Sequence, residues 1–215
     1  DEAHHSTERN VTYRPLLQSE GVGILGLTAT PTRTDGESLG FERETYSIGF
    51  PDLERLGVII KPEPIIELKT KIGFDFADLN KDSLSKLDTD RRNKIITDEL
   101  LKNHDRYTKV VIYVGTVKHA ENLCCILQKS LLAQHYDGIN YVTGNRNSRG
   151  LDRDAFLQVE RELDRSILVN VDVLTEGYDD PSINTVVMAR PTNSKLVYMQ
   201  AMGRAIRHDK KNPDK

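Results

Sequence analysis

Residues 109–131 read KVVIYVGTVKHAENLCCILQKSL, and this stretch decides the fold class. Residues 110–114 form a continuous apolar run rich in β-branched side chains, which is typical of a strand buried on both faces. Gly115 and Thr116 end the run. The apolar residues beyond them recur at intervals of three and four, which predicts an amphipathic helix: Ala120, Leu123, Cys124, Leu127 and Leu131. The stretch therefore predicts a buried strand that leads directly into a helix.

The same alternation of strand and helix continues towards the C-terminus. Three further apolar runs predict strands at residues 139–142, 167–171 and 185–188. Helical periodicity precedes this region at residues 89–103 and recurs within it at residues 152–163. Strands that alternate with helices favour a parallel sheet with right-handed crossovers and helices on both faces. The sequence therefore predicts an α/β fold.

The first part of the chain is less regular. Residues 22–27 predict a short strand interrupted by glycine, and residues 51–56 predict a short helix. Residues 61–64 read KPEP, and two prolines this close cannot both lie in a helix interior or a central strand. We therefore place a linker there and expect a strand after it, at residues 65–68.

The composition excludes some classes of protein. Of the 215 residues, 37% are hydrophobic and 29% are charged, a balance typical of a globular chain with a sizeable core. The formal net charge of −3 does not favour bulk binding to a polyanion, so any contact with nucleic acid must be local. No apolar run approaches the roughly 18 residues of a membrane-spanning helix. The adjacent Cys124 and Cys125 cannot supply a spaced set of metal ligands. We therefore expect a cytoplasmic protein with no membrane partner.

Loops rich in glycine, hydroxyl and amide groups come after the predicted strands. They are Gly115 with Thr116, residues 143–146, residues 172–180 and residues 190–194. Because the carboxyl ends of parallel strands meet at one edge of a sheet, we expect these loops to lie together. Their backbone N–H groups and side chains suit phosphate oxygens without a net positive charge.

A last helix is predicted around residues 200–207, which read QAMGRAIR. At 100° per residue, Gln200, Arg204 and Arg207 share one face. The opposite arc is apolar and consists of Tyr198, Met199, Met202, Ala205 and Ile206. Gly203 lowers helix propensity by roughly 1 kcal/mol relative to alanine, so we expect it to allow a close backbone approach. We expect both guanidiniums to be exposed, and a solvated charged surface is an alternative interpretation of this face.

Five short segments resemble, in order, the motifs of superfamily 2 helicases and translocases. They are DEAH at residues 1–4 (motif II), TAT at 28–30 (motif III), residues 111–123 (motif IV), LTEGYD at 174–179 (motif V) and QAMGRAIR at 200–207 (motif VI). Motifs V and VI are most similar to the branch that contains the motor subunits of type I and type III restriction enzymes and related DEAD/DEAH-like repair helicases.

This resemblance implies two RecA-like lobes with ATP and Mg²⁺ bound in the cleft between them and a nucleic-acid strand lying across both. Residues 1–60 would be the C-terminal remnant of the first lobe, residues 61–81 a linker, and residues 82–215 the second lobe. The second lobe would be a RecA-like parallel sheet with helices on both faces. The function implied is that of a helicase or translocase that couples ATP hydrolysis to movement along a strand, DNA rather than RNA.

The resemblance also implies roles for individual residues. Those expected to act in catalysis are Glu2, as general base, together with Gln200, Arg204 and Arg207. Those expected to bind the nucleotide are Asp1, His4, Gly177 and Asp179, with Asp1 holding Mg²⁺ through water. Those expected to contact nucleic-acid phosphates are Thr116, Thr143, Gly144, Arg146 and Thr175. Thr28 and Thr30 would couple the nucleotide state to lobe closure.

One motif of the family is absent from the sequence. No segment matches the Gly-rich P-loop, G-x-x-x-x-G-K-[ST], which cradles the triphosphate. We therefore expect a fragment that begins at motif II and does not hydrolyse ATP by itself. Its expected partners are nucleic acid, the remainder of the first RecA-like lobe and, as in the restriction-type branch, a nuclease or specificity subunit.

Two other interpretations are consistent with the sequence. The lobe could act without chemistry, as a non-hydrolytic binding module for a nucleic-acid strand or a protein. Alternatively, Asp1, Glu2, His4 and His5 could form a hydrolytic metal site. Metal sites usually draw their ligands from separated positions on rigid elements, which disfavours this last interpretation.

Overall fold

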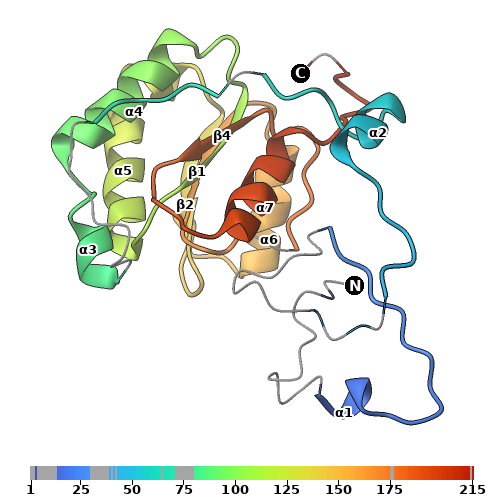
Figure 1. Cartoon of the computed structure of the whole chain (residues 1–215). Coiled ribbons are helices and arrows are strands. Elements are labelled where there is room, and N and C mark those ends of the chain that lie inside the picture. Colours follow the sequence, from blue (N-terminus) through green and yellow to red (C-terminus); the bar gives the residue numbers. More distant parts are fainter. Residues whose placement is uncertain are drawn as a thin grey trace.

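Figure 1 shows the computed structural model, which describes residues 3, 14–29, 39, 41, 43–63, 65–70, 80–174, 177–213 and 215. Its largest part is a parallel sheet with helices on both faces. Among the residues described, no helix is both long enough and apolar enough to cross a membrane.

Four strands form the sheet: β1 (Lys109–Tyr113), β2 (Gly138–Val142), β3 (Ser166–Asn170) and β4 (Thr185–Met188). Their order is β2-β3-β1-β4, and every neighbouring pair is parallel. β1 and β3 are buried along their whole length because each has a strand on either side and helices on both faces. Each strand lies within one residue of the apolar run that predicted it, and the α/β prediction is confirmed.

One face of the sheet is covered by α4 (Asp90–Lys102) and α5 (Val117–Lys129). Ile96 of α4 and Leu123 of α5 belong to the same core cluster as Ile112 of β1. The apolar face that the periodicity predicted for each helix is therefore the face that packs on the sheet. Two short elements flank them in the sequence: α3 (Lys81–Ser85) precedes α4, and the 3-10 helix η2 (Leu131–Gln134) follows α5.

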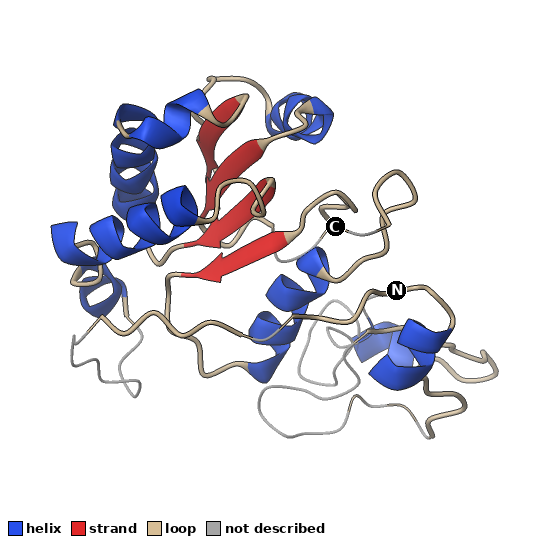
Figure 2. Cartoon of the chain, turned by 90° about the horizontal axis from the view of Figure 1, so that it is seen from above, coloured by secondary structure: helices blue, strands red, loops and turns tan. Residues whose placement is uncertain are grey.

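The other face is covered by α6 (Arg153–Glu162) and α7 (Lys195–Ala205). Phe156 of α6 and Ala201 of α7 pack in a second cluster with Val111 of β1. Because successive side chains of a strand point to opposite faces, β1 contributes to both clusters. Figure 2 shows helices on either side of the four strands.

Side chains cap the first turn of each long helix. Thr89, Thr116, Asp152 and Ser194 each accept a hydrogen bond from a backbone N–H of the helix that comes after it. Such caps satisfy N–H groups that have no partner within the helix. Thr116 and Ser194 lie in the loops after β1 and β4, so these caps fix α5 and α7 relative to the carboxyl edge of the sheet.

Residues 14–29 lie apart from the sheet in Figure 1 and contain α1 (Arg14–Leu17), a single turn. The strand predicted at residues 22–27 is not formed. Val22 and Leu25 are 61% and 74% exposed, because no described strand lies alongside this segment to pair with it. The apolar run therefore gave a wrong prediction, since the described residues contain no strand that could hydrogen-bond to it.

The segment around the predicted linker contains one helix, α2 (Phe50–Arg55), which confirms the helix predicted at residues 51–56. The strand predicted at residues 65–68 is wrong for the same reason as the first: Ile65 and Ile66 are exposed and no described strand pairs with them. The domain boundaries stay predictions.

The chain beyond α2 pairs with the chain beyond α7. Ile60 N donates to Ile206 O at 2.8 Å, and Ile59 forms an antiparallel bridge with Arg207. This short pairing holds the backbone of Ile206 and Arg207 against the chain beyond α2. It therefore helps to position the backbone of Arg207.

Candidate functional site

The loops predicted to bind phosphates leave the sheet at its carboxyl edge. Backbone bonds extend the ladder one residue beyond the strands: Val114 N donates to Asn170 O at 3.0 Å, and Val171 N donates to Val142 O at 3.2 Å. The loops after β1, β2 and β3 therefore start from neighbouring positions, as the parallel sheet requires.

Thr116 caps α5 at this edge. Its Oγ1 accepts from His119 N at 3.2 Å, and the residue is half-buried. The hydroxyl hydrogen is not used in that bond, so the side chain can still donate to a phosphate oxygen. Gly115 before it is tightly packed, since a Cβ there would lie 2.9 Å from the Cβ of Leu84. Glycine is therefore the residue that lets β1 turn into α5 here.

The turn after β2 is built by Thr143. Its Oγ1 accepts from Arg146 N at 3.1 Å, and its own N donates to Arg146 O at 2.7 Å. Thr143 is only 3% exposed, whereas Gly144 and Arg146 are exposed. Arg146 lies 3.6 Å from a carboxylate oxygen of Glu121. In this turn, a phosphate can therefore reach Gly144 and Arg146, while Thr143 shapes the backbone.

The side chains of Arg204 and Arg207 meet at one backbone carbonyl. Arg204 Nη1 donates to Tyr178 O, and Arg207 Nη1 lies 3.4 Å from the same oxygen. Arg207 Nη1 also pairs with Asp179 Oδ1. The segments that resemble motifs V and VI are therefore in direct contact.

The two arginines do not share the polar helix face that was predicted. α7 ends at Ala205, so Arg207 lies beyond the helix. Arg204 is 7% exposed and lies on the buried side of α7 with Ala201, one turn earlier. The prediction that both guanidiniums are exposed is wrong for Arg204, whereas the side chain of Arg207 is 36% exposed. A guanidinium can be buried where its donors meet backbone carbonyls, which a helical wheel does not reveal.

Gly203 is not pressed against another segment. A Cβ at this position would meet no described atom within 4 Å, so the predicted close backbone approach is wrong among the described residues.

Gln200, one turn earlier on α7, and Thr28 in the N-terminal segment are both half-buried.

Positive φ angles mark the loop after β3. Gly177 has a φ of +70° and Asp172 has a φ of +55°. This left-handed region is open to glycine and uncommon for other residues, although aspartate tolerates it better than most. Asp172 pairs with Arg190, which lies just after β4, so the pair spans the end of β1. Sequence reasoning did not single out Asp172 and Arg190 individually, and their places directly after strands were the available signal.

Tyr113, the last residue of β1, lies near the arginine pair. Its hydroxyl donates to Leu174 O at 3.1 Å. Burial raises the pKa of Tyr113 to about 12, and the positive charges of Arg204 and Arg207 act in the opposite direction. Tyr113 therefore stays neutral at physiological pH and holds the start of the loop that contains Gly177.

A cavity of about 200 Å³ lies between α6 and the loop after β3. It is lined by Arg153, Asp154, Leu157, Arg161, Val173, Gly177 and Tyr178. Two of these side chains are cationic and were not singled out from the sequence. Their positions on one side of α6, at the start and at the end of that helix, were the only available signal.

Several predicted site residues lie outside the described residues: Asp1, Glu2, His4, Thr30 and Thr175. The predicted residues that the structure brings together are therefore those of motifs V and VI, namely Gly177, Asp179, Arg204 and Arg207. The phosphate-contact candidates Thr116, Gly144 and Arg146 lie in the loops after β1 and β2.

The family model described as "Helicase conserved C-terminal domain" matches residues 91–209, which is more than half of the chain. This chain belongs to that helicase family. A protein of Saccharomyces cerevisiae has a name that assigns it to the ATP-dependent helicases. It is 26% identical to this helicase chain, and the match covers 96% of this chain. The endonuclease subunit of the type I restriction enzyme EcoKI from Escherichia coli is 30% identical over 91% of the chain.

A solved structure extends the likeness to the fold. The fragment assigned as an HsdR subunit of a type I restriction enzyme from Vibrio vulnificus has a TM-score of 0.50 at 28% identity, covering 65% of this chain and 27% of the other. The helicase chain spans 31% of the yeast protein and 19% of the EcoKI subunit. The resemblance to superfamily 2 helicases and the RecA-like α/β fold are confirmed.

Proposed function

We propose that this chain provides the second lobe of an ATP-dependent motor that moves along a nucleic-acid strand, with DNA as the preferred track. The observation that carries the proposal is the convergence of Arg204 and Arg207 on Tyr178 O, between Gly177 and Asp179. This contact joins the two segments to which the resemblance gives a role in ATP hydrolysis.

Of the two arginines, Arg207 is the one that a phosphate can reach. Its side chain is 36% exposed and that of its partner Asp179 is 74% exposed. A γ-phosphate accepts hydrogen bonds from the same planar fork of N–H donors and carries more charge than one carboxylate. We therefore expect it to replace Asp179 on Arg207, while the buried Arg204 keeps the carbonyl of Tyr178 in place and adds its charge. In related phosphoryl-transfer enzymes such an arginine raises the rate by ~10³-fold or more.

ATP and Mg²⁺ enter the proposal through the resemblance. On this lobe the residues fit a nucleotide: Gly177 has no described atom within 4 Å of its Cβ position, and Arg207 and Asp179 supply a donor and an acceptor beside it. Asp1 would hold the metal ion and Glu2 would orient the attacking water, both outside the described residues. When bound, the metal ion neutralises charge on the β- and γ-phosphates.

The nucleic-acid track would pass over the loops after β1 and β2. Gly144 and Arg146 are exposed, and the Thr116 hydroxyl can donate a hydrogen bond. Such groups bind backbone phosphates without reading bases. The preference for DNA rests on the likeness to a restriction endonuclease subunit, which also motivates a nuclease or specificity subunit as a partner. The remainder of the first lobe is the other proposed partner.

Steady-state ATP hydrolysis tests this function. Residues 1–215 alone contain no P-loop and should hydrolyse ATP at the background rate. A complete protein that carries both this chain and a P-loop should be stimulated by single-stranded DNA more than by RNA of the same length. Turnover by residues 1–215 alone would contradict the proposal. Salt-sensitive strand binding without any ATP turnover in the complete protein would instead favour the non-hydrolytic binding module.

A further inference from the structure

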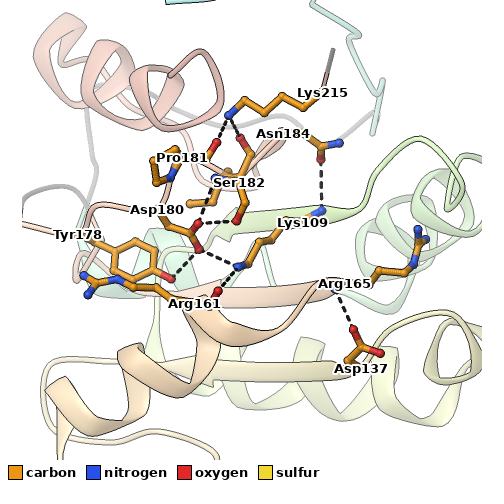
Figure 3. A network of polar contacts seen from close by, with 11 residues as sticks. Lys109, Asp137, Arg161, Arg165, Tyr178, Asp180, Pro181, Ser182, Asn184 and Lys215 are labelled. Carbon is orange, nitrogen blue, oxygen red and sulfur yellow. Dashed lines mark hydrogen bonds and ion pairs between the residues drawn. The ribbon is translucent and has the colours of Figure 1, made fainter. Parts of the chain in front are cut away.

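A buried polar network lies at the opposite, amino-terminal edge of the sheet (Figure 3). Its centre is an ion pair between Lys109, the first residue of β1, and Asp180, with Nζ and Oδ2 3.0 Å apart. The two side chains are 4% and 5% exposed. Lys109 Nζ also donates to Arg161 O, near the end of α6, at 2.9 Å. The pair therefore ties a strand, a helix and the connection between β3 and β4.

Asp180 is fully used as an acceptor. Oδ2 accepts from the hydroxyl of Tyr178 at 3.2 Å, and Oδ1 accepts from both the backbone N and the hydroxyl of Ser182. On the other side of this segment, Lys215 Nζ donates to Ile183 O at 2.6 Å and to Pro181 O. The backbone around Asp180 is therefore fixed from several directions.

Tyr178 links this network to the arginine pair. Tyr178 is 3% exposed, the guanidinium of Arg161 lies 5.0 Å from its ring centroid, and its hydroxyl donates to Asp180. Its backbone carbonyl is the acceptor shared by Arg204 and Arg207. One residue therefore has its side chain in the network and its carbonyl in the candidate site.

The residue on the amino-terminal side of Tyr178 is a glycine. Gly177 has a φ of +70°, and no described atom lies within 4 Å of its Cβ position. Glycine has no side chain that restricts its backbone angles, so Gly177 itself does little to fix the residue after it. Contacts on the carboxyl-terminal side, where Asp180 is held by Lys109, therefore help to position the Tyr178 carbonyl.

We propose that Lys109 and Asp180 are positioning residues for the arginine pair, acting through Tyr178. A buried ion pair is weak evidence for stability, since well-packed apolar residues can often replace it, and the role assigned to this pair is to fix one backbone position. The consequence for ATP hydrolysis rests on the proposed function, whereas the ordering of the two guanidiniums does not.

Arginine side-chain NMR on the ¹⁵N-labelled chain tests the ordering directly. The Nε–Hε signals of Arg204 and Arg207, assigned with Arg204→Lys and Arg207→Lys, should be resolved in the wild-type chain, and the buried Arg204 should exchange with water more slowly than Arg207. Both signals should broaden or average in Asp180→Asn and shift in Tyr178→Phe, which removes only the hydroxyl. Unchanged signals in both variants would overturn the proposal.

A double variant separates positioning from stability. Asp180→Asn leaves Lys109 buried without its partner, so this variant is expected to unfold at a lower temperature. In Lys109→Met/Asp180→Leu neither charge of this pair remains buried, and part of the lost unfolding temperature should be recovered while the arginine signals stay averaged. Recovery of both would show that packing alone orders the arginines and would overturn the proposal.

A matched control uses a polar cluster on the other face of the sheet. Asp88 Oδ1 accepts from Asn93 Nδ2 at 2.8 Å beside α4, and the side chain of Asp88 is 12% exposed. Asp88→Asn should lower stability without changing the signals of Arg204 and Arg207. Loss of those signals in Asp88→Asn would mean that they respond to any loss of stability in the chain. The proposal that Lys109 and Asp180 position the arginine pair would then fail.

Kinetics of the complete protein provide the second readout. Asp180→Asn should lower kcat for ATP by roughly tenfold or more and leave KM nearly unchanged, because the interaction lost is one made in the transition state. A fall in kcat/KM that comes only from KM would contradict a role for Asp180 in positioning the arginines. Absence of ATP turnover in the wild-type protein would reject the proposed function while the NMR result still decides the ordering.

Discussion

The guanidinium of Arg207 is paired with the carboxylate of Asp179, although Asp179 precedes it by 28 residues and Arg207 lies beyond the end of α7. Both side chains are open to solvent, at 36% and 74% exposed. Exposed ion pairs contribute little to stability, so this pair can be exchanged for a ligand at small cost. Until such a ligand binds, the pair holds Arg207 beside Tyr178.

Asp179→Ala should therefore separate stability from function. The free energy of unfolding should fall by less than about 1 kcal/mol, because the pair is exposed. ATP turnover by the complete protein should fall, because Arg207 is no longer held beside Tyr178 before the nucleotide binds. Chemical denaturation and steady-state kinetics measure the two effects. Asp52→Ala, which breaks the exposed pair with Arg55 on α2, is the control and should change neither beyond that small amount. Equal turnover in both variants would remove Asp179 from the site.

Gly203→Ala should stabilise the chain. No described atom lies within 4 Å of the new methyl group, and alanine gains about 1 kcal/mol over glycine in a helix interior. Thermal unfolding checks this gain. Gly144→Ala, in an exposed loop, also meets open space but has no helix to favour, so its unfolding temperature should change less. A destabilised Gly203→Ala variant would show that another segment does approach this position.

Thr116→Ala should have two separable effects. Removal of the cap on α5 should lower stability by about 1 kcal/mol. Thr89→Ala removes the equivalent cap on α4 and serves as the control for that loss. Fluorescence anisotropy with single-stranded DNA should show weaker binding only for Thr116→Ala. If both variants bind the strand equally, the Thr116 hydroxyl does not contact phosphate.

Glu160→Gln should stabilise the chain at neutral pH. Burial raises the pKa of Glu160, while Arg149 and Asn140 act in the opposite direction. A carboxyl whose pKa is higher in the folded state contributes stability below its unfolded pKa of 4.5 and loses it as the pH rises through the folded pKa. Glutamine keeps an acceptor for Asn140 and has no proton to lose.

Thermal unfolding as a function of pH measures this difference. The Glu160→Gln variant should exceed the wild type at pH 7 and approach it below about pH 4.5, where Glu160 is protonated in both states. Glu162→Gln, an exposed position on the same helix, should show no such dependence. A wild type that is more stable than Glu160→Gln at pH 7 would mean that the charge of Arg149 outweighs burial.

The regular part of the fold could be predicted because its signals are local. Residues 110–114 are apolar throughout, since β1 is buried on both faces, and the glycine and hydroxyl loops mark the strand ends. The apolar run at residues 22–27 carried the same kind of signal and gave a wrong prediction. A strand also needs a partner, and pairing is a long-range property that composition does not encode.

The sequence predicted which residues form the candidate site, but it did not predict their burial or their hydrogen-bond partners. The resemblance assigned Gly177, Asp179, Arg204 and Arg207 to one ATP site, and the structure brings them together. The burial of Arg204 was missed because a helical wheel assigns a charged residue to the solvent side. The acceptor was missed as well, since the carbonyl of Tyr178 is a backbone group whose position depends on contacts distant in sequence.

The most direct test of the proposed role of the arginine pair is ATP turnover, stimulated by single-stranded DNA, in the complete protein with Arg207→Ala. We predict a fall in kcat of ~10³-fold, as expected when an arginine that stabilises phosphoryl transfer is removed. Arg55→Ala, in the exposed pair on α2, should retain the wild-type rate. If Arg207→Ala retained a kcat within about twofold of the wild type, the arginine pair would not act on the γ-phosphate and the central claim would be contradicted.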